Sequence, residues 1–275
     1  MNKMNENSFP KDAIRLLKET SRTFYIPITF LQKELKNTVA SAYLVFRAID
    51  EIEDHEEIDN ELKHTILMQV SELFKHPFNE QTYLHILEPV KDAMPEVTLR
   101  LGEWIQACPK NTLQIVMDAA NEMAWGMAKW AKANWTIRTR EDLDDYTYYV
   151  AGLVGVMLSD LWEVCAGVKT DRDLAIGYGR GLQAVNILRN EQEDLVERGV
   201  SFVPDNWTRA ELFAYADENL AKADDYMKSL NKKSILLFCR LPLALAHKTL
   251  KAMKDGREKI TRDEVEQTVK EIQVD

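Results

Sequence analysis

Apolar residues recur along this chain at the three- and four-residue spacing of amphipathic helices, and alternating strand patterns are almost absent. Only 10 glycines and 8 prolines interrupt the pattern, and neither a low-complexity linker nor an internal repeat divides it. The pattern predicts one all-α domain over residues 1–275, with more helices than a four-helix bundle holds. The predicted helices are 9–20, 32–54, 59–75, 80–93, 95–107, 110–133, 140–167, 171–199, 208–230, 233–254 and 261–273.

Threonines that are followed three residues later by an acid mark several of the predicted helix starts. In such a pair the hydroxyl accepts a hydrogen bond from a free backbone N–H, and the acid reaches back to the threonine. We expect each of these threonines to be the N-cap of its helix. The pairs are Thr139 with Asp142, Thr170 with Asp173, Thr208 with Glu211, and Thr261 with Glu264.

The composition gives a sizeable core and an acidic surface. Hydrophobic residues make up 45% of the chain, and the formal net charge is −10. This charge argues against nucleic acid as a partner, because phosphate backbones attract a surplus of lysine and arginine. A small anionic substrate remains compatible with it, since such a substrate needs only a local pocket that carries cations or a metal.

Cysteine use and the length of the apolar runs indicate a soluble protein. Cys108, Cys165 and Cys239 lie far apart without a CxxC pair, which fits a reduced cytosolic compartment and gives no zinc site. The first residues are polar and lack the pattern of a signal peptide. The longest apolar run, 149–158, is shorter than the ~20 residues of a membrane span. We expect a cytoplasmic protein that can contact a membrane peripherally.

The first candidate site is a polar stripe in the segment YLVFRAIDEIED. Tyr43, Arg47, Asp50 and Asp54 are spaced by four, three and four residues, so they share one helical face. Two carboxylates one turn apart repel each other and cost an isolated helix roughly a few tenths of a kcal/mol. A divalent cation reverses this sign, and oxygen ligands of this kind suit Mg²⁺ that is bridged to substrate phosphates.

The second candidate site is a polar stripe in the segment GLQAVNILRNEQED. Gln183, Asn186, Asn190 and Asp194 are spaced by three, four and four residues, with apolar residues between them. If the two stripes face each other across a bundle, they enclose a cavity lined by oxygen atoms, which is how helical bundles usually build sites.

Each stripe alone also has a plainer interpretation. The chain has 45 acidic residues, so an Asp-x-x-x-Asp spacing on a solvated helix face is common by chance. Asn and Gln on an apolar helix can also be core amides with satisfied hydrogen bonds. Spacing alone therefore leaves three interpretations open: a solvated face, core amides, or a metal site.

Longer stretches resemble a known family. SRTF (21–24), LVFRAIDEIED (44–54), YTYYVAGLVG (146–155) and LQAVNILRNEQED (182–194) resemble, in the same order, the motifs of squalene/phytoene synthases. The resemblance extends over roughly 21–204. It implies the isoprenoid-synthase fold, an all-α single-domain helical bundle with a central cavity. It also implies enzymes that bind allylic prenyl diphosphates with Mg²⁺ and join two of them head-to-head, with NADPH as reductant only where squalene is made.

The resemblance also assigns roles to residues that match the family motifs. The implied metal ligands are Asp50, Glu53, Asp54, Asn186, Asn190 and Asp194. The implied substrate-binding residues are Ser21, Arg22, Tyr43, Arg47, Gln183 and Asn186. The implied catalytic residues are Tyr146, Asp50 and Asp54.

Some of these positions keep a structural alternative. The ring and hydroxyl of Tyr146 could steady a cation or relay a proton, or the side chain could be an interior tyrosine without a catalytic role. Arg22 could be an ordinary surface arginine. For Arg189, which lies off the stripe, we expect a structural ion pair. Gly152 and Gly155 indicate a close approach between helices or a local break in one helix.

Two positions depart from the family pattern. Asn190 stands where the second motif begins with an aspartate, so it keeps an oxygen ligand but loses the charge. Downstream, Val200 stands where an arginine is usual, and the loop is one residue longer, so Arg198 could take the arginine's place by a shift of register. Both changes affect the half of the site that handles metal and diphosphate.

These departures favour a Mg²⁺-dependent enzyme that converts farnesyl diphosphate to farnesol without coupling. The alternatives are a head-to-head synthase that makes presqualene diphosphate, dehydrosqualene, squalene or phytoene, and an inactive protein that binds prenyl diphosphates. The end of the chain carries no hydrophobic tail, which favours a cytosolic enzyme over a membrane-tethered squalene synthase. Prenyl chain length, use of NADPH and oligomeric state are left open by the sequence.

Overall fold

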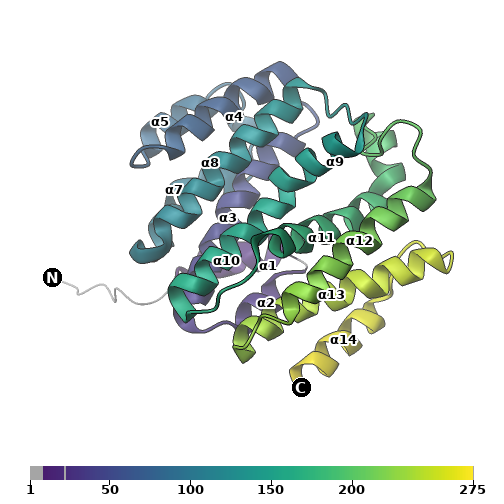
Figure 1. Cartoon of the computed structure of the whole chain (residues 1–275). Helices are drawn as coiled ribbons and strands as arrows, with labels where there is room; N and C mark the ends of the chain where they lie inside the picture. Colours follow the sequence, from purple (N-terminus) through teal and green to yellow (C-terminus); the bar gives the residue numbers. More distant parts are fainter. Residues whose placement is uncertain (1–8, 22, 275) are drawn as a thin grey trace.

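The structure, a computed structural model, describes residues 9–21 and 23–274 and contains no β-strand in these ranges. Figure 1 shows the helices as a single bundle. Its first half consists of α1 (Lys11–Thr20), α2 (Tyr25–Phe30), α3 (Lys33–Asp54), α4 (Asn60–Phe74), α5 (Glu80–Leu87), the 3-10 turn η1 (Lys91–Ala93), α6 (Glu96–Leu99), α7 (Leu101–Ala107) and α8 (Lys110–Lys132). Its second half consists of α9 (Arg140–Thr147), the π-helical turn η2 (Tyr148–Gly152), α10 (Leu153–Ala166), α11 (Arg172–Glu193), the π-helical turn η3 (Asp194–Arg198), α12 (Arg209–Met227), α13 (Lys233–Lys254) and α14 (Arg262–Val274).

Two long helices, α3 and α11, organise the bundle. Helix α3 packs against α1, α2, α4, α6, α7, α8 and α10, while α11 packs against α9, η2, α10, α12 and α13. Helix α14 lies outside α13, at the edge of the bundle (Figure 1). The all-α fold predicted from the helical periodicity is confirmed.

The apolar side of α3 explains why its polar stripe has a fixed direction. Leu44, Val45, Ala48, Ile49 and Ile52 are all fully buried in the core. Burying a side chain of the size of Leu or Ile is worth about 1.5–3 kcal/mol, so this face cannot rotate toward solvent without a large loss. The polar residues between these positions are thereby held on the opposite side of the helix.

Several predicted helix boundaries were wrong. The prediction contained no helix at α2, and the predicted helix 80–93 ends at Leu87, shortly before Pro89. Met94 is extended because the ring of Pro95 disfavours helical geometry in the residue before it. The predicted helix 95–107 is divided into α6 and α7 at Arg100, whose backbone leaves the helical region.

The capping prediction holds for three of the threonines and fails for one. Thr139 accepts a hydrogen bond from the Asp142 amide at 3.1 Å, and Asp142 accepts one from the Thr139 amide at 3.0 Å. Reciprocal bonds also join Thr261 with Glu264, and a capping box begins α12 at Thr208. At α11 the N-cap is Asp171 rather than Thr170, because the Asp171 carboxylate accepts the Leu174 amide at 3.0 Å.

Glycines allow α11 to touch α10 and the adjoining turn η2 through their backbones. A β-carbon on Gly155 would lie 2.1 Å from the Ala175 carbonyl oxygen, and one on Gly179 would lie 2.2 Å from the Ala151 carbonyl oxygen. The turn η2, which ends at Gly152, is a π-helical interruption between α9 and α10. Both consequences expected from the AGLVG segment, a close approach and a local break, are therefore present.

The stretch Arg140–Ala166, which joins α9, η2 and α10, is long and apolar enough to meet the criteria for a membrane-crossing helix by length and composition. Its buried side chains, among them Leu153, Leu161 and Trp162, belong to the core, and α10 packs against α8 and α11. Contact with these helices accounts for its apolar composition.

We expect Gly155→Ala to destabilise the protein by about 2–4 kcal/mol, because the added methyl meets a backbone carbonyl that cannot move without shifting α11. Urea unfolding followed by circular dichroism measures this loss. The matched control is Gly102→Ala in α7, where the added methyl meets chiefly the flexible Glu80 side chain at 3.2 Å. Equal stability of the two variants would show that the α10–α11 contact does not need glycine.

Candidate active site

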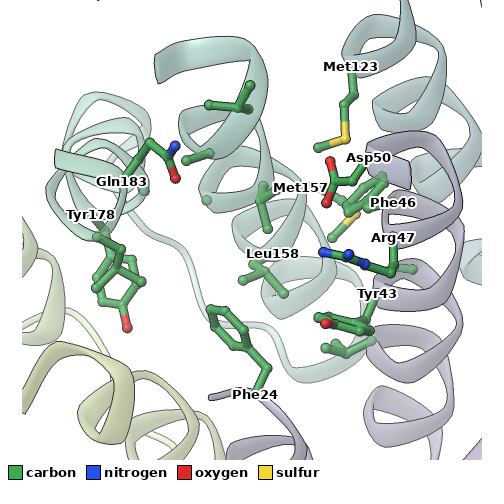
Figure 2. A pocket seen from close by; sticks show the side chains of 18 of the residues that line it. Phe24, Tyr43, Phe46, Arg47, Asp50, Met123, Met157, Leu158, Tyr178 and Gln183 are labelled. Carbon is green, nitrogen blue, oxygen red and sulfur yellow. The ribbon is translucent and has the colours of Figure 1, made fainter. Parts of the chain in front are cut away.

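Two cavities of opposite character lie side by side between α3 and α11. A polar cavity of about 480 Å³ is lined by the ends of both helices and by η3. An apolar cavity of about 200 Å³ adjoins it, lined mainly by α3, α10 and α11, with Phe24 from the turn before α2 and Phe238 from α13 (Figure 2). The residues that line both cavities are Arg47, Asp50, Val150, Gln183 and Asn186.

The structure brings the two predicted polar stripes together. In Figure 2, Asp50 and Arg47 reach into the space from α3, and Gln183 reaches in from α11 on the other side. The positions that line the polar cavity are Arg47, Asp50, Glu53, Asp54, Gln183, Asn186, Asn190 and Asp194. Tyr43 lines the apolar cavity only. The sequence therefore predicted correctly which faces of α3 and α11 oppose each other.

The acidic side chains of α3 lie where burial and mutual repulsion disfavour their charged forms. Burial and repulsion from Asp54 raise the pKa of Asp50 to about 8, although the nearby Arg47 opposes the shift. The Glu53 side chain is almost fully buried, and burial followed by repulsion from Asp54 raises its pKa well above the usual range. The Arg47 Nε donates to Glu51 at 2.7 Å, an acid that the sequence reasoning had left without a role.

Arg198 supplies the cation that the sequence left in question. Its Nη1 donates to Asp54 at 3.0 Å and its Nη2 to Glu53 at 3.4 Å, across the polar cavity. Burial opposes the charge of this guanidinium, but Glu53 and Asp54 outweigh that effect, so its pKa is raised. Val200 is buried in the core, and its amide donates to the Asp194 carbonyl at 3.2 Å. An arginine at position 200 would be directed into the core, whereas Arg198 reaches the acids.

The second stripe is weaker in charge. The Asn190 amide oxygen accepts a hydrogen bond from the Arg189 Nε at 3.1 Å. The ion pair expected for Arg189 is not observed among the described residues, where its bond goes to this neighbouring amide. Burial, followed by repulsion from Asp54, raises the pKa of Asp194, against the attraction of Arg198. Asn190 contributes an oxygen to the cavity wall but no charge.

Tyr146 lies at the floor of the polar cavity. Its ring stacks on Phe202 with centroids 4.7 Å apart and meets Trp130 edge-on at 5.9 Å. Burial, with the charge of Glu53 as the next cause, raises the pKa of its hydroxyl well above the usual value. The tyrosine therefore remains protonated, and its ring forms part of the cavity wall next to the acids of α3.

Aromatic and sulfur-containing side chains form the apolar cavity. Phe24, Met157 and Leu158 point into it in Figure 2. Tyr178 presents its ring to the same space, while its hydroxyl donates to the Cys239 carbonyl at 2.6 Å and leaves the wall apolar. Met123 from α8 also lines it. These side chains can hold a hydrocarbon tail whose polar end lies at Asp50.

The SRTF segment shows a structural role at its first residue. Ser21 is buried, and its hydroxyl accepts the Phe24 amide at 2.9 Å, which fixes the turn before α2. Ser21 lines neither cavity, so its binding role stays a prediction. The Tyr43 hydroxyl donates to the Thr20 carbonyl at 2.8 Å and holds the same turn against α3. Arg22 lies outside the described residues.

Sequence reasoning missed part of the wall near Arg198. The guanidinium carbon of Arg198 lies over the rings of Trp135, at 5.2 Å, and Phe202, at 5.6 Å. Behind Trp135, the buried Lys63 places its Nζ 5.1 Å from the same ring, and burial lowers the pKa of this lysine. These residues belong to separate helices and loops, and no spacing in the sequence links them to the acidic motifs.

The donor set fits a cation that the protein does not enclose by itself. Within 9–21 and 23–274, no three acidic, histidine or cysteine side chains converge closely enough to hold a metal ion. The cavity nevertheless presents carboxylate and amide oxygens from two sides. Mg²⁺ commonly takes one or two carboxylates and completes its octahedron with water and substrate phosphates. An open set of hard oxygen ligands suits this mode of binding.

A family model for squalene/phytoene synthases matches residues 17–213. The chain belongs to the squalene/phytoene synthase family, and the resemblance seen in the motifs is confirmed. This family consists of enzymes that act on prenyl diphosphates.

Curated relatives and solved structures agree with this assignment. The chain is 30% identical to the squalene synthase of Eremothecium gossypii over 93% of its own length, and 29% identical to that of Rattus norvegicus over 91%. It spans 64% and 66% of the lengths of these two relatives. The complex of TcSQS with the ligand BPH1237 shares the fold, with a TM-score of 0.77, 23% identity, and coverage of 94% of this chain and 84% of that one.

We expect Asp50→Asn to stabilise the protein at pH 8 in buffer without divalent cations. The folded-state pKa of Asp50, about 8, lies above its ordinary value of 3.8, so the folded protein retains a proton that the unfolded chain has lost. The contribution of Asp50 to stability therefore falls as the pH rises from about 4 to about 8.

The variant should gain at least about 1 kcal/mol at pH 8 and almost nothing at pH 4, measured by urea unfolding with a chelator present. The exposed Asp118→Asn is the matched control and should show little difference at either pH. A gain in stability that does not depend on pH would show that the buried charge of Asp50 is not its cause.

Proposed function

We propose that this protein is a Mg²⁺-dependent enzyme that binds one allylic prenyl diphosphate, with farnesyl diphosphate as the expected substrate, and releases the prenyl alcohol. The observation that carries the proposal is the pair of adjoining cavities. The apolar cavity, at about 200 Å³, is smaller than the roughly 300–1,000 Å³ of pockets that hold drug-sized ligands. It suits one extended hydrocarbon chain rather than two chains side by side.

The apolar and the charged residues of the two cavities have different roles toward the substrate. The apolar wall around Phe24, Met157 and Leu158 excludes water from the tail and fixes its direction. Arg47 and Arg198 face the diphosphate end of the substrate and can neutralise charge that develops on the leaving group. When bound, Mg²⁺ supplies further neutralisation of the diphosphate, and Asp50, Glu53, Asp54, Asn186, Asn190 and Asp194 would hold it.

Hydrolysis then requires only a water molecule at the boundary between the cavities. The bond between the allylic carbon and the diphosphate oxygen breaks, the water oxygen bonds to that carbon, and its proton passes to solvent through the polar cavity. Cleavage at phosphorus would give the same alcohol. The Tyr146 ring lines the polar cavity, four residues before Val150, which lines both cavities, and it can stabilise positive charge on the carbon through its π face.

A second candidate is head-to-head condensation of two prenyl diphosphates. The similarity to enzymes named squalene synthase over 93% of the chain favours it, and so does Arg198, which supplies a cation despite Val200. Condensation requires a second chain in the same space and control of two cations. The small apolar cavity argues against the first requirement, and the uncharged Asn190 argues against the second. A condensing enzyme of the squalene-forming type would also need NADPH.

We further propose a prenyl diphosphate as the small-molecule substrate and the cytoplasm as the location, with peripheral membrane contact through the apolar substrate or product. The acidic charge of −10 gives no reason to expect nucleic acid.

We expect purified protein with labelled farnesyl diphosphate and Mg²⁺ to form a C15 alcohol, with or without NADPH. Chelation of the metal and Asp50→Ala should each lower the rate at least about 100-fold, because the diphosphate then leaves without its counter-charge. Chromatography that separates products by chain length measures the C15 alcohol and any C30 product. A C30 hydrocarbon as the main product would reject hydrolysis in favour of condensation, and absence of any turnover would reject both.

We expect Asn190→Asp to tighten apparent Mg²⁺ binding during turnover by about tenfold. The added carboxylate restores the charge of the second motif at a position that already lines the cavity. Asn190→Ala is the control, because it removes the amide oxygen without adding charge. If both variants show the same apparent Mg²⁺ affinity, the charge at position 190 does not contribute to metal binding.

A further inference from the structure

The contact of Arg198 with the first acidic motif uses the same oxygen atoms that a metal would need. The guanidinium bonds to Asp54 and Glu53 at 3.0 and 3.4 Å, and both carboxylates line the polar cavity. Arg198 comes from η3, beyond the end of α11, so this one side chain ties the two halves of the site together. A divalent cation that binds these oxygens of Asp54 and Glu53 competes with the guanidinium for them.

Aromatic rings hold the guanidinium independently of these carboxylates. The central carbon of Arg198 lies over the rings of Trp135 and Phe202, and Phe202 is itself stacked on Tyr146. Stacking on rings restrains the plane of a guanidinium but leaves its N–H groups free to choose acceptors. The side chain can therefore exchange carboxylate oxygens for phosphate oxygens without leaving its place in the wall.

The backbone around Arg198 also permits a small displacement. The residue ends a π-helical turn and is followed by Gly199, whose φ of +64° lies in the left-handed region. Nothing lies within 4 Å of a β-carbon built on Gly199, so the turn has open space beside it. The backbone can therefore shift at Gly199 without meeting a packed side chain there.

We infer that Arg198 is the counter-ion of the first acidic motif in the absence of substrate, and that it gives up Asp54 and Glu53 to the metal only when a diphosphate accepts its hydrogen bonds instead. The metal alone then binds weakly, because it competes with a cation that is already in place. Metal and diphosphate bind together, because each removes the obstacle to the other. This inference rests on the metal-dependent function proposed above and makes its metal binding conditional on the substrate head group.

The test is the affinity for Mn²⁺, used as a spectroscopic substitute for Mg²⁺, measured by electron paramagnetic resonance at pH 8 with and without inorganic pyrophosphate. For Arg198→Met we expect Mn²⁺ alone to bind about tenfold more tightly than to the wild type, since a competing charge is removed. Pyrophosphate in the presence of metal should bind about tenfold more weakly. A residue with a merely structural role would weaken both.

The coupling between the two ligands gives a second readout. Pyrophosphate should tighten Mn²⁺ binding strongly in the wild type and much less in Arg198→Met, and the reverse effect must be equal by linkage. Arg198→Lys keeps a charge but loses the planar fork, so we expect intermediate values. Circular dichroism checks the fold of each variant, and Arg198→Gln replaces Arg198→Met under the same criteria if the latter loses helical signal.

Arg189→Met is the matched control, because it removes a positive charge from the same cavity without touching Asp54 or Glu53. Its effect on Mn²⁺ alone should be less than about a third of that of Arg198→Met. Unchanged or weaker Mn²⁺ binding by folded Arg198→Met, or equal effects of the two variants, would overturn the inference. Because binding is measured without turnover, a protein that forms neither alcohol nor C30 product would refute the proposed function and leave this result intact.

Discussion

The repulsion among buried carboxylates on α3 is the interaction on which the rest of the site depends. Asp50, Glu53 and Asp54 face a cavity in which burial and mutual repulsion raise the pKa of Asp50 and Glu53. The protein tolerates this cost because the apolar side of the same helix is firmly packed in the core, and because Arg47 and Arg198 lie close by. Stability is given up at the place where a strongly charged ligand can recover it, a common arrangement at functional sites.

Contacts of backbone with backbone hold α11 against α10 and η2, and α10 in turn packs against α3. Gly155 in α10 approaches the Ala175 carbonyl of α11, and Gly179 in α11 approaches the Ala151 carbonyl of η2. The π-helical turn η2 places Val150 and Ala151 at the cavity wall, and η3 does the same for Arg198. Irregular helical turns of this kind are frequent at functional sites because they redirect one or two side chains while the helix continues.

Much of the fold and the central part of the site could be predicted from the sequence. Helical periodicity gave the all-α class, and the three- and four-residue spacing of Asp50, Asn186 and their neighbours identified the two faces that meet. The short helix α2 and the break at Arg100 were missed, because their signals are local and weak compared with tertiary packing. Trp135 and Lys63 were missed for a different reason. They lie near Arg198 only through tertiary contacts between segments that are far apart in the sequence, and residue spacing does not indicate such contacts. The register of Arg198 was left open by the sequence, and burial of Val200 explains it.

The residues shared by the two cavities have a consequence for how an amphiphilic substrate is positioned. An amphiphile settles where its oily part and its ionic part each meet a matching medium, as a detergent does at the surface of water. Arg47, Asp50, Gln183 and Asn186 mark that surface inside the protein. In the proposed substrate, the bond that joins the prenyl tail to the diphosphate would therefore lie at this boundary, whatever the length of the tail. A longer or shorter tail would then extend further or less far into the apolar cavity, which Phe238 also lines, while the bond to the head group keeps its position.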